Sequence, residues 1–249
     1  MGGAIRLVTS SSVAYNWNTG NGTWDTVSPN WSGAGPTWGD NGDAFFTNTA
    51  AFTTVTVDGT RTADAVTIGN ATSFANYSFT GGTLALSSFR VQGWGDRLTG
   101  LSTPTAFSNV TVNASGNISV GRWTLVMGGN SVITAAGLVG GTWGTLIIRD
   151  NAFVTATGGM SANADAHWLF YLNGGTFVTK NIVAADTTWY DSAQLKFNGT
   201  VVKPTQDTAN FITLIGSIGE GFSSSTLVDN GGAIFDTDGK NIGIGVGLK

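Results

Sequence analysis

A short unit recurs along this chain, in which an apolar strand is followed by a glycine-rich turn and a second apolar strand. It is clearest from Leu172 to Ile182, where an Asn-Gly-Gly turn separates two apolar segments. Variants of the unit lie at residues 79–86, 127–134, 149–155 and 229–236. Such internal self-similarity is the sequence signature of repeat folds, in which each unit buries its apolar side against its neighbours. The repeat therefore constrains the fold more than any single residue does.

The spacing of the unit distinguishes a solenoid from a sandwich. Equivalent unit starts lie at Gly81, Gly129, Asp150, Gly174 and Gly231. The second and third intervals are short and fit single rungs. The first fits two rungs, and the last fits two rungs with an insertion near 204–210 or 216–225. Rungs of roughly 20 to 25 residues with two or three short strands are typical of a parallel β-helix. We therefore predict an all-β, right-handed parallel β-helix (a β-solenoid); the alternative is a β-sandwich, which needs no regular interval.

The composition agrees with short strands and turns. Glycine accounts for 37 of 249 residues and charged residues for only 10%, so long helices are not expected. The net charge of −4 is spread evenly, without a cluster of Lys or Arg. Nucleic acid and anionic membrane surfaces are therefore disfavoured as partners. The absence of cysteine excludes disulfides and thiolate metal sites.

The same composition gives an expectation about location. A cysteine-free, acidic chain rich in Gly, Thr and Asn fits an extracellular or cell-surface bacterial protein. No apolar run approaches about 18 residues, so no membrane span is predicted. The segment from Met1 to Thr9 lacks a basic region followed by a long apolar stretch, so we expect no signal peptide in this chain.

Tryptophan marks the N-terminal region. Trp17, Trp24, Trp31 and Trp38 recur at a regular heptad-like spacing, but the Gly, Pro and Asn-Gly turns between them exclude a heptad helix. A solenoid needs a lid over its terminal rung. We predict that residues 1–50 form an N-terminal segment with a Trp-rich cap and that residues 51–249 form one continuous β-helix domain. Stacking of these rings on sugars is the alternative role.

Several stretches resemble a known family of repeats. They are residues 77–86, 171–182, 196–203 and 228–242, each an apolar strand that ends at an Asn-Gly, Gly-Gly or Asn-Gly-Gly turn. They resemble the autotransporter-associated β-strand repeat, and the Trp-rich start between Asn16 and Asp40 looks like that of such secreted bacterial proteins. The resemblance implies a β-helical passenger of a large exported or surface protein. It implies no catalytic residues.

No residue constellation identifies a reaction, and we name no catalytic residue. His167 is the only histidine, and no Gly-x-Ser-x-Gly elbow accompanies it. Carboxylates offer weak calcium sites. Asp40 with Asp43, and Asp236 with Asp238, could supply oxygens to Ca²⁺, although polar turns explain the same residues. Apart from this weak calcium prediction, we expect no cofactor.

Aromatic residues at predicted turns are the candidate contacts for a ligand or partner. They are Trp94, Trp123, Trp143, Trp168, Trp189 and Tyr190. A tryptophan on the flank of a solenoid either stacks on carbohydrate or packs against a neighbouring rung or chain. Asp186 and Asp191 flank the last two of these aromatics, and a polysaccharide-cleaving groove that uses these two acids is the alternative.

These observations lead to two predictions of function and a third, narrower one. The first is a non-enzymatic, structural or adhesive β-solenoid that self-assembles end to end, as stacked rods or filaments, or binds other surface proteins. The second is a polysaccharide-binding or polysaccharide-degrading β-helix protein. The third is an ice-binding solenoid, suggested by Thr-x-Thr runs such as Thr54 and Thr56, but these runs do not recur in register.

Overall fold

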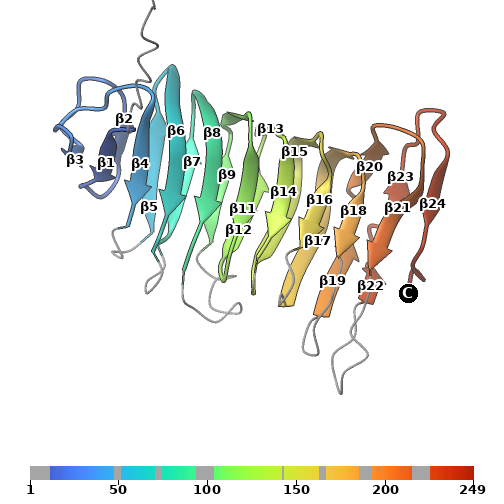
Figure 1. Cartoon of the computed structure of the whole chain (residues 1–249). Helices are drawn as coiled ribbons and strands as arrows, with labels where there is room; N and C mark the ends of the chain where they lie inside the picture. The colour runs from blue at the N-terminus through green and yellow to red at the C-terminus, as the bar shows by residue number, and fades with distance from the viewer. Residues whose placement is uncertain are drawn as a thin grey trace, which may run out of the picture.

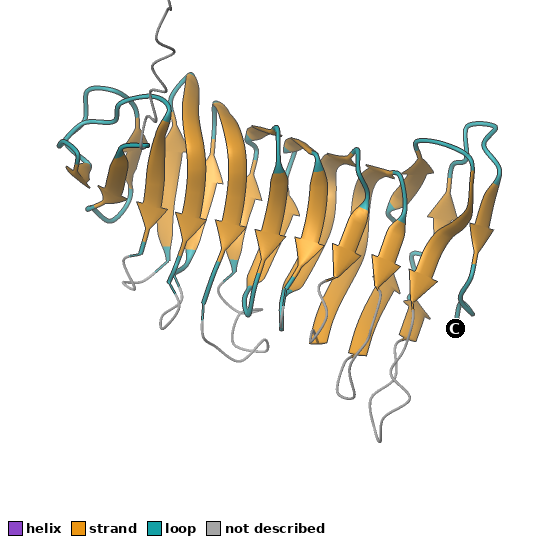
Figure 2. Cartoon of the chain, viewed as in Figure 1, coloured by secondary structure: helices purple, strands orange, loops and turns teal. Residues whose placement is uncertain are grey.

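In the computed structural model, the chain winds as a β-solenoid of short parallel strands (Figure 1). The structure describes residues 12–47, 52–70, 75–93, 104–141, 143–162, 167–184, 192–214 and 225–249. All regular elements in these ranges are strands (Figure 2). No helix that could cross a membrane occurs in this part of the chain. The prediction of an all-β parallel solenoid is confirmed. The alternative β-sandwich is wrong, because strands of successive coils pair in parallel.

Each coil contributes strands to three series, and each series forms one side of the solenoid. The first series is β2 (Gly22–Trp24), β5 (Thr53–Val57), β7 (Tyr77–Thr80), β9 (Thr105–Ser108), β12 (Thr124–Gly128), the first half of β15 (Thr145–Ala156), the first half of β17 (His167–Thr179), β19 (Ser192–Phe197) and β22 (Ser225–Val228). Every step within this series is a parallel pairing.

The second series follows the first around the coil. It is the first half of β6 (Thr60–Ile68), the first half of β8 (Thr83–Val91), β10 (Thr111–Ala114), β13 (Val132–Ala135), the second halves of β15 and β17, β20 (Val201–Pro204) and β23 (Ile234–Phe235). The third series completes the coil. It is β1 (Ala14–Trp17), β4 (Gly42–Phe46), the second halves of β6 and β8, β11 (Asn117–Val120), β14 (Gly137–Gly140), β16 (Met160–Ala162), β18 (Ile182–Ala184), β21 (Thr208–Leu214) and β24 (Ile242–Ile244).

The register gives the length of a coil. Val112 pairs with Ile133 and Ile133 with Val154, and farther along the chain Phe177 pairs with Val202. Each of these steps advances the chain by one coil, of the length of roughly 20 to 25 residues that is typical of a parallel β-helix. The predicted rung length is therefore confirmed in this region. The first and last intervals of the turn motif each span two coils, as predicted, because a turn after Ser108 falls inside the first and a turn after Phe197 falls inside the last.

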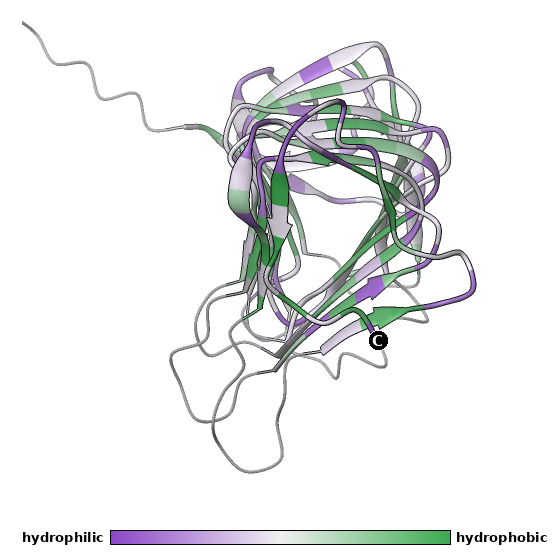
Figure 3. Cartoon of the chain, turned by 90° about the vertical axis from the view of Figure 1, so that its right-hand side faces the viewer, coloured by the Kyte–Doolittle hydropathy of each residue, from purple (hydrophilic) through white to green (hydrophobic). Residues whose placement is uncertain are grey.

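Alternation along each strand separates the core from the outer surface. In β13, Ile133 is fully buried while Val132 and Thr134 on either side of it are exposed. Successive side chains of a strand point to opposite faces, so residues in register form continuous inner columns. One column is Val55, Phe79, Phe107, Met127, Ile148, Leu172 and Phe197, all fully buried. Figure 3, viewed along the solenoid, shows the three sides surrounding this interior.

The glycine-rich turns stack on one another between the first and second series. Asn109 has φ 57° and Asp150 has φ 59°, both in the left-handed region. The side chain of Asn109 accepts a hydrogen bond from the backbone N–H of Asn130 at 2.9 Å, and Asp150 accepts one from Gly129 at 2.9 Å. Gly175 (φ 69°) has no room for a Cβ, because that atom would collide with the carbonyl oxygen of Ala152. The recurring turn of the sequence is thus a ladder along one corner of the solenoid.

The predicted role of the N-terminal tryptophans in packing agrees with the structure. Trp17, Trp24, Trp31 and Trp38 are all buried and belong to the same core cluster as the coils that follow. The Trp24 ring centroid lies 5.2 Å from that of Trp31 and 5.0 Å from that of Trp38. The short strand β3 (Trp31–Gly33) pairs antiparallel with β1, the only antiparallel pairing among the described strands. This strand and the four rings close the N-terminal end of the core.

Candidate functional site

The outer surface of the second series carries two regular columns of side chains. The first column is Thr83, Thr111, Val132, Phe153 and Thr176, and the second is Ala85, Asn113, Thr134, Thr155 and Val178. We call these ten residues the outer series-2 face. Their strand neighbours Leu84, Val112, Ile133, Val154 and Phe177 point inward and are fully buried. Because successive side chains of a strand point to opposite faces, the ten residues of the outer series-2 face point away from the core.

The outer series-2 face is regular and uncharged. Parallel strands lie about 4.8 Å apart and alternate residues about 6.6 Å apart, so the two columns form a nearly rectangular array. None of the ten side chains is ionisable. Val132 and Phe153 are each 44% exposed, a large fraction for apolar residues inside a strand. Threonine hydroxyls and one asparagine amide supply hydrogen-bonding groups beside these apolar side chains.

Charged pairs lie beyond this face, toward the C-terminal coil. The Nζ of Lys203 in β20 lies 2.6 Å from the carboxylate of Asp236, in the next coil. The hydrogen bond between them lowers the pKa of Asp236 and raises the pKa of Lys203. On the first series, the Nζ of Lys196 lies 2.7 Å from Asp229, and that hydrogen bond raises the pKa of Lys196. Both pairs join the last two coils, and neither places a charge within the outer series-2 face.

A shallow groove lies on the outer surface of the third series. Its volume is about 370 Å³, and it follows the solenoid axis from β11 to β18. Gly137 and Gly159 form its floor, where two consecutive coils lack a side chain, and Asn117 and Asn181 lie at its two ends. Ser161 lies along it between Val139 and Val183. Small side chains thus create the groove, and its lining contains no charged group.

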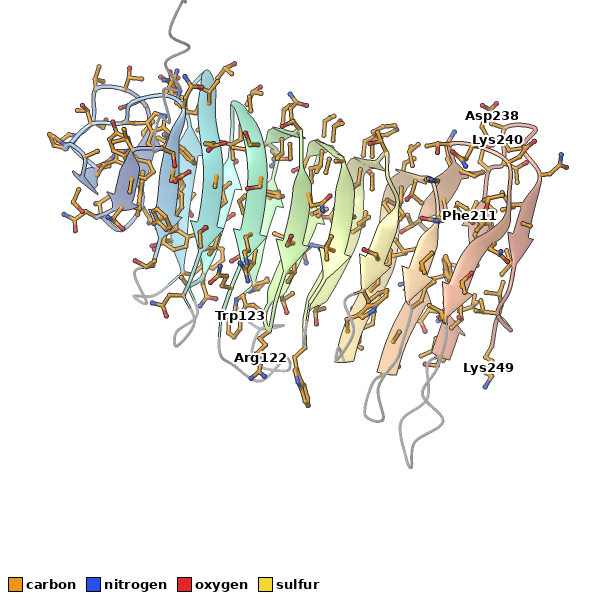
Figure 4. All side chains as sticks on the ribbon, viewed as in Figure 1. Arg122, Trp123, Phe211, Asp238, Lys240 and Lys249 are labelled. Atoms are coloured by element: carbon orange, nitrogen blue, oxygen red, sulfur yellow. The ribbon has the colours of Figure 1, made fainter. Side chains whose placement is uncertain are left out.

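Two of the candidate aromatic contacts are core residues. Trp123 and Trp168 are almost completely buried, and Figure 4 shows Trp123 at the start of β12. Trp168 packs beside Gly140 of β14, where a Cβ on the glycine would lie 3.4 Å from the indole ring, an ordinary van der Waals contact. Packing, one of the two roles predicted for these residues, is therefore the observed one. Both residues were predicted to lie at turns, and the direction of their side chains into the core was not predicted.

The other aromatic candidates have different outcomes. Trp143 is 40% exposed in the turn before β15, with φ 61°, so it stays a candidate for contact with a ligand or partner. Trp94, Trp189 and Tyr190 lie outside the described residues, as do Asp186 and Asp191. A ligand or partner contact at these three aromatics, and a cleaving groove at the two aspartates, therefore stay predictions.

The four aspartates that were candidate calcium ligands accept hydrogen bonds or pair with lysines. Asp40 accepts hydrogen bonds from the indole N–H of Trp38 at 3.0 Å and the backbone N–H of Thr62 at 3.2 Å. Asp43 accepts one from the backbone N–H of Ala65 at 3.2 Å. These last two contacts join β4 and the turn before it to β6 of the next coil.

At the other end, Asp236 pairs with Lys203, and the Asp238 carboxylate lies 3.2 Å from Lys240. No group of three or more His, Asp or Glu residues that could hold a metal gathers among the residues that the structure describes. Calcium binding stays a prediction. His167 begins β17, where its backbone pairs with that of Ser192.

Comparisons with known proteins identify no relative. Neither the family models nor the curated proteins match the sequence, and no solved structure matches the fold. The resemblance to the autotransporter-associated repeat is supported at the level of a β-solenoid.

Proposed function

We propose that this protein is a non-enzymatic, structural or adhesive solenoid of the bacterial surface or exterior, a β-helical passenger of the autotransporter-repeat type. The outer series-2 face is its adhesive surface. The observation that carries the proposal is the register of ten uncharged outward residues over five consecutive coils. A rigid backbone holds these side chains at fixed spacing, so contact with a flat partner orders few new groups. That rigidity lowers the entropic cost of adhesion.

The chemistry of this face favours a neutral partner. A charged surface would lose hydration at the contact without gaining an opposite charge. Valine, phenylalanine and threonine methyl groups bury apolar area, while hydroxyls and the Asn113 amide provide hydrogen bonds. Neutral polymers and uncharged patches of other surface proteins have this mixed character. Adhesion of this kind should persist at high salt, because salt weakens charge pairs and not apolar contact.

The experiment is adsorption of the labelled protein to microcrystalline cellulose, chitin and polystyrene at low and high salt. Wild-type protein should adsorb to at least one of them, equally at both salt concentrations. The double variant V132K/F153K places two charges in the first column of the outer series-2 face and should weaken adsorption roughly tenfold or more. V27K, at an exposed loop near the capped end, is the matched control and should bind as wild type. Equal adsorption by the double variant would overturn the proposal.

A second candidate function rests on the groove of the third series. Neutral groove walls with asparagine amides at both ends suit an extended, uncharged glycan, and its course along the axis suits a polymer. Polysaccharide binding is therefore the alternative, and cleavage would need groups that this groove lacks. The variant V139K separates the two functions, because it should block the groove and leave the outer series-2 face intact.

A further inference from the structure

Three asparagines occupy equivalent turn positions in consecutive coils, beside the outer series-2 face. Asn109, Asn130 and Asn151 each lie two residues before a member of the first column of that face, and all three are exposed. The strands that follow these turns, β10, β13 and the second half of β15, pair in parallel and in register. The three asparagines therefore stack along the solenoid axis, about 4.8 Å per coil, and we call them the amide column.

Hydrogen bonds within the amide column orient its side chains. The Oδ1 of Asn109 accepts a hydrogen bond from the backbone N–H of Asn130 at 2.9 Å, and the Nδ2 of Asn151 donates one to the Oδ1 of Asn130 at 3.1 Å. Within the part of the chain that the structure describes, the Nδ2 groups of Asn109 and Asn130 donate no hydrogen bond and the Oδ1 of Asn151 accepts none. The column therefore offers a ligand both donors and an acceptor, in fixed positions.

The amide column borders the most apolar part of the outer series-2 face. Val132 and Phe153 pair in register, and each exposes a large fraction of its side chain. They lie in the same two coils as the last two members of the amide column. On their other side, the second column of the face adds the hydroxyls of Thr134 and Thr155. Two exposed apolar side chains thus have hydrogen-bonding groups on both sides.

The charges nearest to the amide column in sequence cancel. The Nε of Arg149 lies 3.5 Å from the carboxylate of Asp150, which also accepts a hydrogen bond from the backbone N–H of Gly129. An uncharged surface is complementary to a neutral partner, because an ion bound there would lose hydration without gaining an opposite charge. The occupant must therefore be neutral, with apolar faces beside groups that both donate and accept hydrogen bonds. Hydroxyl groups do both.

We infer that the amide column and the adjoining face bind an extended neutral polysaccharide, of the β-1,4-linked class of cellulose and chitin, lying along the solenoid axis. The C–H faces of its sugar rings pack on Val132 and Phe153. Hydroxyls at one edge of the rings bond to the amide column, and those at the other edge bond to Thr134 and Thr155. Such a chain advances by about one coil per sugar, so successive sugars meet equivalent groups. The inference rests on the proposed adhesive function of the outer series-2 face and specifies its partner.

Adsorption of the N130A/N151A variant to cellulose, chitin and polystyrene tests the inference. This variant removes both partners of one hydrogen bond together, and neither residue has positive φ, so the fold should persist, with wild-type circular dichroism. It should adsorb roughly fivefold or more weakly to each polysaccharide that wild type binds, and as wild type to polystyrene, which has no hydrogen-bonding groups. The matched control is N18A/N210A, whose asparagines are exposed just after β1 and in β21, away from the second series. It should adsorb as wild type to all three.

The three surfaces separate failure of this inference from failure of the adhesive function. V132K/F153K should weaken adsorption to every surface that wild type binds, whereas N130A/N151A should weaken adsorption to the polysaccharides alone. Wild-type adsorption to polystyrene but to neither polysaccharide would overturn the inference and leave the adhesive face in place. So would polysaccharide adsorption that N130A/N151A leaves unchanged, or an equal loss on polystyrene. Polysaccharide adsorption abolished by V139K would assign the glycan to the groove of the third series and overturn the inference. No adsorption to any surface would overturn both proposals.

Discussion

Two phenylalanines on neighbouring coils of the second series provide a matched test of the inward and outward assignment. Phe177 lies in the inner column between Val154 and Val202 and is fully buried. Its ring centroid lies 5.4 Å from that of Phe170, in an edge-to-face arrangement. Phe153 lies in the outer column and is 44% exposed. The same substitution, phenylalanine to alanine, should therefore destabilise the protein strongly at Phe177 and only slightly at Phe153.

The magnitudes follow from burial. F177A removes a buried aromatic side chain and leaves a cavity, which costs about 3 to 5 kcal/mol in free energy of unfolding. Loss of the ring pair with Phe170 falls within that range, since such pairs contribute about 0.5 to 1.5 kcal/mol. F153A removes a ring that is already half in water, so we expect a change of about 0.5 kcal/mol or less. The difference between the two variants, about 3 kcal/mol, is a large fraction of the usual stability of a domain.

Urea unfolding followed by circular dichroism measures both variants against wild type. F177A should lower the unfolding midpoint strongly and F153A should leave it nearly unchanged. Because each coil contacts only its neighbours, amide exchange should accelerate most in β15, β17 and β20 of F177A. Equal destabilisation by the two substitutions would refute the register that assigns Phe177 to the core and Phe153 to the surface.

Three further predictions concern the cap, the turn ladder and the last coil. W24A should destabilise the protein by about 3 to 5 kcal/mol and reduce the near-ultraviolet circular dichroism, because the ring is buried among other aromatic rings of the cap; unchanged unfolding in urea would refute the packed cap. G175A should lower the thermal midpoint far more than G232A, because both sites have positive φ but only Gly175 lacks space for a Cβ; equal losses would contradict the turn geometry. The pair of Lys203 and Asp236 should stabilise the last coil at neutral pH. Because the pKa of Asp236 is lowered from its ordinary value of 3.8, the stabilisation is present above pH 3.8 and is lost as the pH falls through the lowered pKa. Because the pKa of Lys203 is raised, the stabilisation is also lost at strongly alkaline pH. Melting curves of wild type and K203Q should therefore converge at both extremes, and a constant difference across the pH range would refute the pairing.

Turn chemistry made the fold predictable from the sequence. The Asn-Gly-Gly unit near Gly174 and its variants mark the corner between the first and second series. Left-handed backbone at such a corner requires glycine, asparagine or aspartate, so the motif persists where strand sequences vary. Its intervals indicated the coil length and located the two stretches that each hold two coils. The same local logic identified the tryptophan cap, because turn residues between Trp17 and Trp38 excluded a helix.

The candidate surfaces were less accessible from the sequence. Thr-x-Thr runs do not recur along the chain, yet parallel register brings Thr83, Thr111 and Thr176 from separate coils into one column. The coils between these residues differ in length, which hides the column from a search at a fixed period. A search that aligned the strands directly following each turn would have found it. Trp168 is a second example, because it packs beside Gly140 of β14, a neighbour that the sequence alone does not reveal.

The most direct test of the account is a distance measured along the solenoid. Thr60 and Val201 lie in one outer column, joined through Thr83, Thr111, Val132, Phe153 and Thr176. Six steps at about 4.8 Å place them about 29 Å apart, although they are far apart in sequence. Pulsed electron paramagnetic resonance on the spin-labelled T60C/V201C variant should give one narrow distribution near that distance, broadened only by the labels. A broad distribution, or a peak displaced by more than about 10 Å, would contradict the stacked parallel register on which the proposed surfaces depend.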